Sequence, residues 1–91
     1  MKATFLIEDL FKIGDSNIVP VGSIKRGVLS VGMKTEVMGK TMKVQSIEIK
    51  HKKVTEAQTG ESIGIFLENG DYDILKNYIK QEIIFSDKNN Y

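Results

Sequence analysis

Two glycine-containing motifs are the first places in this chain where chemistry could occur. The segment G-V-L-S-V-G-M-K-T, residues 27–35, is one residue away from a phosphate-binding P-loop. In that loop the lysine directly follows the second glycine, and a helix begins there. Here Met33 stands between Gly32 and Lys34, and the residues that follow favour strands. We therefore expect this stretch to bind neither ATP nor GTP.

The second motif, G-E-S-I-G at residues 60–64, matches the pattern around the nucleophilic serine of α/β-hydrolases. That serine needs a sharp strand-to-helix turn and a histidine base. The flanking Ile63, Ile65 and Leu67 instead alternate as they do in a strand. A chain of 91 residues is also too short for the hydrolase fold. We interpret the match as coincidental.

Few other side chains could catalyse a reaction. The chain has no cysteine, which excludes disulfides, zinc–thiolate sites and thiol catalysis. His51 is the only histidine. Glu8 and Asp9 are neighbours in a predicted strand, so they point to opposite faces and make a poor acid–base pair. The sequence therefore predicts a protein that is not an enzyme and that has no cofactor and no metal site.

Positive charge is concentrated in the middle of the chain. Residues 25–53 carry a net charge of +6, whereas the whole chain carries +1. The basic residues are Lys25, Arg26, Lys34, Lys40, Lys43, Lys50, Lys52 and Lys53. Two explanations stay open: lysines keep strands soluble and protect sheet edges, or the stretch attracts an anionic partner. The stretch contains no aromatic residue on which a base could stack.

Alternating apolar residues predict about six short strands. The predicted strands are residues 3–13, 18–26, 34–38, 41–50, 62–68 and 83–85, with a tight hairpin at Gly39 and Lys40 between the third and fourth. In the first strand, Phe5, Ile7, Phe11 and Ile13 share one parity, which is broken only at Asp9.

Local signals modify this pattern in three places. A change of parity predicts a bulge near Gln45 and Ser46. Pro20 cannot donate a ladder hydrogen bond, so we expect it at a sheet edge or a bulge. Residues 71–81 have apolar residues four apart, with Asp71 or Asp73 as a possible cap, and predict a short helix.

Together these elements predict an all-β fold, a small six-stranded antiparallel closed barrel with one short helix near residues 71–80. Glycines suit such a barrel because its curvature requires bends and close backbone approach. The glycines to which we assign this structural role are Gly22, Gly27, Gly32, Gly60 and Gly64. We expect one barrel domain over residues 1–86 and a frayed tail over 87–91. No apolar run approaches the roughly 20 residues of a membrane span, so we expect a cytoplasmic protein without a membrane partner.

Three segments of the chain resemble the second domain of elongation factor Tu and related translational GTPases. They are F-L-I-E-D-L-F-K-I (5–13), V-G-S-I-K-R-G-V-L-S-V-G (21–32), and K-V-Q-S-I-E-I-K-H-K-K-V-T-E-A-Q-T-G-E-S-I-G-I-F-L (43–67). The most specific part is the run at 22–32, and the run at 57–64 reinforces it. The resemblance implies a six-stranded β-barrel of the translation-protein type. It implies no bound GTP, since nucleotide binding in that family belongs to a separate preceding domain.

The resemblance also implies binding residues. In elongation factor Tu this barrel helps to hold the aminoacylated end of transfer RNA, and in other members it contacts ribosomal RNA or protein. A family carboxylate near the terminal ribose corresponds to Glu48, and a nearby family arginine corresponds to His51. The chain departs from the family at residues 15–17, which replace a basic turn, at Pro20 in the second strand, and at residues 71–81.

Two binding functions remain open from the sequence. The first is a protein-interaction or scaffold module, with self-association among its forms. The alternative is binding of RNA or a ribonucleoprotein through the basic side formed by residues 25–53. The candidate binding residues are Lys25, Arg26, Glu48, Lys50, His51, Lys52 and Lys53.

Overall fold

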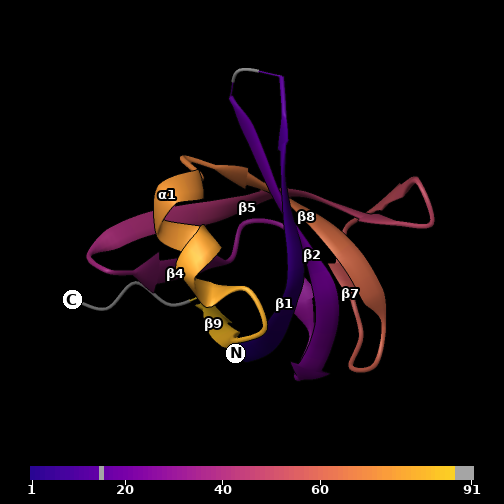
Figure 1. Ribbon diagram of the computed structural model, residues 1–91. Helices are drawn as coiled ribbons and strands as arrows, with labels where there is room; N and C mark the ends of the chain where they lie inside the picture. The colour runs from indigo at the N-terminus through magenta and orange to yellow at the C-terminus, as the bar shows by residue number, and fades with distance from the viewer. Residues whose placement is uncertain (15, 88–91) are drawn as a thin grey trace.

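Strands make up most of the computed structural model, which describes residues 1–14 and 16–87 (Figure 1). The strands are β1 (Lys2–Ile13), β2 (Asn17–Arg26), β3 (Leu29–Ser30), β4 (Lys34–Val37), β5 (Lys40–Ile49), β6 (Lys52–Val54), β7 (Glu56–Ala57), β8 (Ser62–Glu68) and β9 (Glu82–Ser86). A short helix, α1 (Tyr72–Leu75), continues as a 3-10 turn, η1 (Lys76–Tyr78). Within these described ranges no helix is long and apolar enough to cross a membrane. Apart from Asp87, the predicted tail lies outside them.

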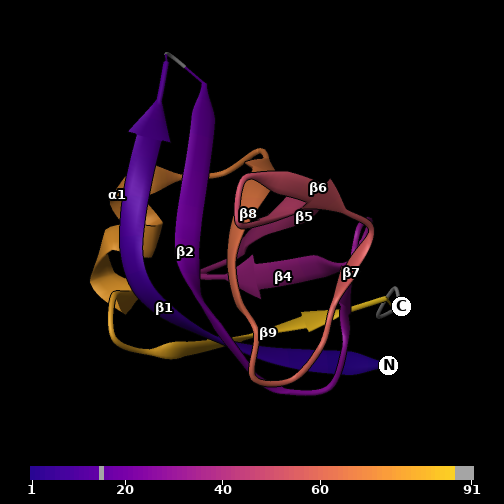
Figure 2. The ribbon, with the colours of Figure 1, turned by 90° about the vertical axis from the view of Figure 1, so that its right-hand side faces the viewer.

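Six strands close into an antiparallel barrel in the order β4-β9-β1-β2-β8-β5, and β5 pairs back to β4. Strand β6 continues the sheet beyond β5, and β3 and β7 form a separate two-stranded ribbon. Figure 2 looks at the molecule from the side of β6 and shows β1 and β2 rising together beyond the barrel. The predicted six-stranded barrel with one short helix is confirmed.

Large apolar side chains fill the interior of the barrel. Phe5 of β1 and Phe85 of β9 are fully buried and meet edge to face, with ring centroids 6.4 Å apart. Met42 and Ile47 of β5 and Ile65 of β8 are also fully buried. Alternation along these strands directs every second residue inward, which is why the period of two in the sequence located them correctly.

A bulge in β1 changes which of its residues face the core. The pairing of β1 with β2 shifts between Ile7 and Asp9, so Glu8 is an extra residue on β1. As a result Phe11 and Ile13, although they share the parity of Ile7, are 48% and 49% exposed. Equal parity along the predicted strand therefore does not give one common face.

Pro20 lies neither at a sheet edge nor at a bulge, the two places expected for it, because β2 lies between β1 and β8 and neither pairing shifts its register at Pro20. The ladder between β2 and β8 is interrupted between the pairs Ile18–Leu67 and Val21–Gly64. Pro20 falls in this interruption and is fully buried. An interruption of the ladder tolerates a residue that has no N–H to donate.

The turn before β5 corrects one prediction, and the middle of β5 confirms another. Val37 pairs with Lys40, so the hairpin turn consists of Met38 and Gly39, one residue earlier than predicted. The register shift between Val44 and Ser46 confirms the predicted bulge.

The segment after β8 packs its apolar side against the core, as the predicted helix requires. Leu75 is fully buried, and Ile74, Tyr78 and Ile79 pack beside it. Asp71 caps α1 by accepting a hydrogen bond from the Ile74 N–H at 3.1 Å. The C-terminal end of this segment is hydrogen-bonded to β1 beside its bulge, since the Ile7 N–H donates to the Gln81 carbonyl at 3.0 Å.

Close approach of β2 to β1 predicts that Gly22 tolerates no side chain. A Cβ at Gly22 would lie 1.8 Å from the Leu6 carbonyl oxygen, whereas a Cβ at Gly64 would meet nothing nearer than 3.5 Å. We expect Gly22→Ala to lower the free energy of unfolding by roughly 3 kcal/mol, because backbone must move. Gly64→Ala, the matched control, should change it by less than about 1 kcal/mol. Urea denaturation measures both, and equal losses would contradict the account.

Because Asp71 caps α1 as a carboxylate, we expect part of the stability of the fold to be lost in acid. The hydrogen bond from Ile74 lowers the pKa of Asp71 below its ordinary value, and the Lys40 ammonium adds to this effect. Because the pKa of Asp71 is lower in the folded than in the unfolded protein, its ionised carboxylate stabilises the fold above about pH 4. This contribution is lost as the pH falls through the pKa of Asp71 in the folded protein. Asn keeps the cap but cannot ionise. We expect the melting temperature of the wild type to fall more steeply than that of Asp71→Asn between about pH 5 and pH 2; parallel curves would refute this.

Candidate functional site

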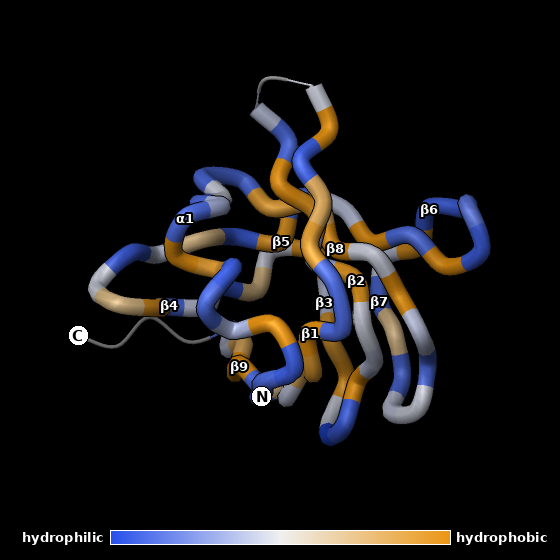
Figure 3. Tube along the Cα trace, in the orientation of Figure 1, coloured by the Kyte–Doolittle hydropathy of each residue, from blue (hydrophilic) through white to orange (hydrophobic). Residues whose placement is uncertain are grey.

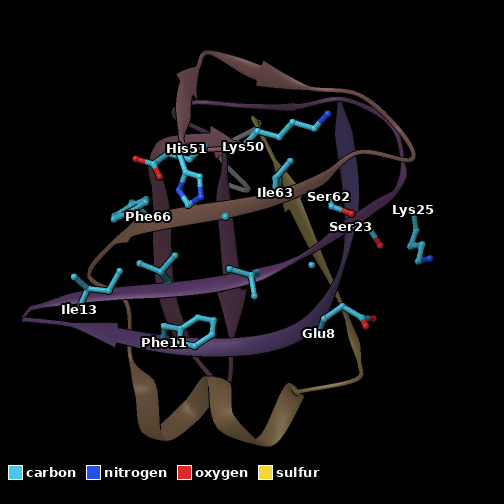
Figure 4. A pocket seen from close by; sticks show the side chains of 15 residues that line it. Glu8, Phe11, Ile13, Ser23, Lys25, Lys50, His51, Ser62, Ile63 and Phe66 are labelled. Carbon is cyan, nitrogen blue, oxygen red and sulfur yellow. The ribbon is translucent and has the colours of Figure 1, made fainter.

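An open groove of about 800 Å³ lies on the outer surface of the barrel, between the β1–β2 hairpin and β8 (Figure 4). Its apolar walls come from three strands. Phe11 and Ile13 lie on β1, Val19 and Val21 on β2, and Ile63 and Phe66 on β8. Figure 3 shows hydrophobic residues continuing from the barrel out into the β1–β2 hairpin.

The β1 bulge and one glycine create this apolar surface. Because Glu8 is inserted, Phe11 and Ile13 turn out of the barrel and face β8 across the groove, as Figure 4 shows. Gly64, opposite Val21, contributes no side chain to the floor. The space that a side chain would occupy stays part of the groove.

Polar groups stand at both ends of the groove. At one end are Glu48 of β5 and the two residues of the β5–β6 turn, Lys50 and His51. At the other end Ser23 and Ser62, which are direct partners across β2 and β8, lie with Lys25. In Figure 4 the His51 ring points into the groove near Phe66. The groove therefore offers hydrogen-bond donors, two lysines and, with Glu8 on its rim, two carboxylates around two phenylalanine rings.

Glu8 marks the rim on the β1 side. Its Oε2 atom lies 3.5 Å from the Lys80 ammonium nitrogen, an exposed ion pair. Exposed pairs contribute little stability, but this one offsets the negative charge of Glu8 at the edge of the groove.

The structure brings together four of the seven candidate binding residues. Lys25, Glu48, Lys50 and His51 line the groove. The other three, Arg26, Lys52 and Lys53, are exposed but are not part of its lining.

The basic stretch at residues 25–53 does not form one side of the molecule. Lys40 begins β5 and Lys50 follows its end, and the two turns point in opposite directions in Figure 1. Lys40 pairs with Asp71 at 3.4 Å instead of adding to the charge near the groove. The expected single basic side is therefore wrong, because a strand of ten residues separates its parts.

Sequence reasoning missed the aromatic part of the site. The absence of aromatics from the basic stretch argued against base stacking, yet Phe11 and Phe66 reach the groove from other strands. The one signal for this in the sequence is the break of parity at Asp9, which the bulge explains.

The described residues contain no group of three or more His, Cys, Asp or Glu that could hold a metal ion. Within the groove, Glu48 can accept hydrogen bonds and the lysines can donate them. Such an arrangement is suited to binding a ligand with a flat ring, hydroxyl groups and negative charge.

Comparison with known proteins identifies relatives of this barrel. The family model described as "Elongation factor Tu domain 2" matches residues 18–76. Elongation factor 1-alpha of Stylonychia lemnae is 32% identical over 79 residues, which are 84% of this chain and 18% of that protein. Elongation factor 1-alpha of Sulfolobus acidocaldarius is 43% identical over 60 residues, 64% of this chain and 14% of that protein.

Solved structures agree with the sequence relatives. Translation elongation factor SelB from Methanococcus maripaludis, in its apo form, superposes with a TM-score of 0.78 at 25% identity. The match covers 94% of this chain and 18% of the SelB chain. The chain thus spans less than a fifth of the length of each of these relatives. With a matching family model, homologous sequences and a shared barrel, this chain belongs to the elongation factor Tu domain 2 family.

Proposed function

We propose that this barrel is a non-catalytic binding module that acts in translation, and that its groove holds the end of a single-stranded RNA. The observation that carries the proposal is the meeting of two phenylalanine rings, a carboxylate and basic side chains in one groove. Membership of a family of translation-factor domains supports a role in translation. This function would place the protein where translation occurs, in line with the cytoplasmic location expected from its sequence.

Each part of the groove has a counterpart in a nucleotide. Phe11 and Phe66 offer ring surfaces on which a base can stack, a contact worth about 1–3 kcal/mol per base. Glu48 can accept a hydrogen bond from a ribose hydroxyl, the role that the family resemblance implies for it. Lys25 and Lys50 supply positive charge for the phosphate backbone.

A protein partner is the second candidate, and the β1–β2 hairpin favours it. Phe11 and Ile13 are about half exposed on a hairpin that rises beyond the barrel. Exposed apolar residues that lie together often mark a protein interface. The groove favours RNA over this candidate because it combines the apolar residues with positive charge, which an apolar interface does not require.

Removal of one ring tests the proposed function. We expect wild-type protein to bind a short single-stranded oligoribonucleotide at low salt, and Phe66→Ala to bind it at least about tenfold more weakly, because stacking is lost. Ile84→Ala is the matched control, since Ile84 is an exposed apolar residue of β9 that does not line the groove. Fluorescence anisotropy with a labelled oligonucleotide measures all three affinities.

The same binding experiment, repeated at several salt concentrations, tests whether the lysines contact phosphate. Contacts from two lysines predict a slope of log affinity against log salt concentration on the order of −1 to −2. Failure of the wild type to bind RNA at low salt, together with capture of one protein partner that survives nuclease treatment, would favour the second candidate.

A further inference from the structure

The outer edge of β1, the one that faces away from β2, changes its partner along the strand. Over residues 2–6 it pairs with β9. At the next residue the Ile7 N–H donates to the Gln81 carbonyl, and the Ile7 carbonyl accepts from the Lys80 N–H. In the part of the chain that the structure describes, neither partner continues beyond the bulge at Glu8. Figure 2 shows β1 there as the outer strand of the hairpin that rises beyond the barrel.

Two residues in this last part of β1 direct their backbone polar groups away from β2. Hydrogen-bonded and non-hydrogen-bonded pairs alternate along an antiparallel ladder. Leu10 is paired with Pro20, which has no N–H to donate, so this is a non-hydrogen-bonded pair. Lys12 is paired with Ile18 two positions further on, and this pair is therefore of the same kind. The N–H and C=O groups of Leu10 and Lys12 consequently point to the open side of the strand.

Asp9 occupies one of these groups with its own side chain. The Leu10 N–H donates to Asp9 Oδ1 at 2.8 Å, which agrees with its direction away from β2. Within residues 1–14 and 16–87, no group accepts from the Lys12 N–H or donates to the carbonyls of Leu10 and Lys12. Open backbone groups along a strand edge are a template on which another strand can pair.

We propose that this edge pairs antiparallel with the same edge of a second copy of the chain. With Phe11 on the twofold axis, Leu10 of each copy lies opposite Lys12 of the other. Both residues of each copy then donate their N–H groups across the pair and accept at their carbonyls, so that every open group has a partner. The inference concerns the edge of β1 and does not depend on RNA binding in the groove.

The side chains of this segment favour the same arrangement. The open part of the strand begins with Asp9 and ends near Lys12, so antiparallel pairing sets its acidic end against the basic end of the other copy. On the face of the groove the two Phe11 rings become direct neighbours, in a non-hydrogen-bonded pair, where side chains approach most closely. Ile13, which is also about half exposed, lies diagonally from Phe11 of the second copy.

The neighbouring registers are less favourable. A shift of the pairing towards the hairpin tip places Lys12 directly opposite Lys12 of the second copy, and like charges in that position repel. A shift towards the barrel places Lys12 opposite Glu8, where the strand is bulged. The register centred on Phe11 is therefore the one that matches the open groups.

The short paired segment makes this association weak. A few residues of strand bury far less than the roughly 1,200 Å² at which stable complexes begin. We expect a dimer with a Kd of about 0.1–1 mM. Asp9 weakens it further, because its carboxylate must leave the Leu10 N–H before the second copy can accept from that group.

Variants at two positions test the role of the backbone groups. Asp9→Ala removes the acceptor and leaves the Leu10 N–H open, whereas Asp9→Asn loses the charge but keeps an acceptor oxygen and is the matched control. Lys12→Pro removes an outward N–H without taking a hydrogen bond from the ladder with β2. Lys12→Ala keeps that N–H and is the control for the lost charge.

Sedimentation equilibrium at protein concentrations from about 10 µM to 2 mM measures the dimer. Asp9→Ala should dimerise about fivefold more tightly than the wild type, and Asp9→Asn as the wild type does. Lys12→Pro should dimerise at least about tenfold more weakly, and Lys12→Ala within about threefold of the wild type. On dilution of the wild type, NMR shifts should change at the amides of Leu10 and Lys12 and stay constant at Lys53 of β6.

Three results would overturn the inference. The first is a wild type and an Asp9→Ala variant that both stay monomeric, even if β1 binds a strand of a different protein. The second is a dimer that Lys12→Pro leaves intact, and the third is a set of concentration-dependent shifts confined to β6. If Lys12→Pro unfolds the hairpin, the comparison of Asp9→Ala with Asp9→Asn decides, and equal dimer affinities of these two variants contradict the inference.

Discussion

The bulge at Glu8 in β1 is the constraint on which the rest of this structure depends. Strand β1 pairs with β9 from Lys2 to Leu6 and with β2 from Thr4 to Ile13. Before the bulge, Phe5 and Ile7 fill the core of the barrel, and after it Phe11 and Ile13 face outward. One strand therefore supplies both the core and the wall of the groove. Without the extra residue, the outer half of β1 would present a different face and the groove would lose its aromatic wall.

The remaining parts of the site follow from barrel closure. In the strand order β8 lies beside β2 and β5 lies beside β8, which places Phe66 opposite the β1–β2 hairpin and Glu48 beside Gly64. Gly22 lets β2 approach β1 closely, and the segment from α1 to Gln81 holds β1 at its bulge from the other side. The turn between β5 and β6, formed by Lys50 and His51, then borders one end of the groove. Charge and aromatic rings meet there although they are far apart in the sequence.

Features set by neighbouring residues could be predicted from the sequence, whereas those set by distant partners could not. Alternation predicted the strands, a parity change predicted the bulge at Gln45 and Ser46, and Asp71 indicated the start of α1. The bulge at Glu8 shifts the register against β2, and the position of Pro20 depends on a local interruption against β8. The residues that neighbour Glu8 and Pro20 in the sequence do not indicate which strands pair with them. For the site, Glu48 and His51 came from a family resemblance, and Phe11 and Phe66 required the three-dimensional arrangement.

The central claim is that the groove, rather than another surface of the barrel, holds the end of an RNA strand. NMR of the ¹⁵N-labelled protein during titration with a short single-stranded oligoribonucleotide tests it most directly. The account predicts shifts clustered at Val21, His51, Gly64 and Phe66, with little change at Met38 and Lys40 on the opposite turn. Shifts confined to Arg26, Lys40 and Lys43, or no shifts at low salt, would contradict it.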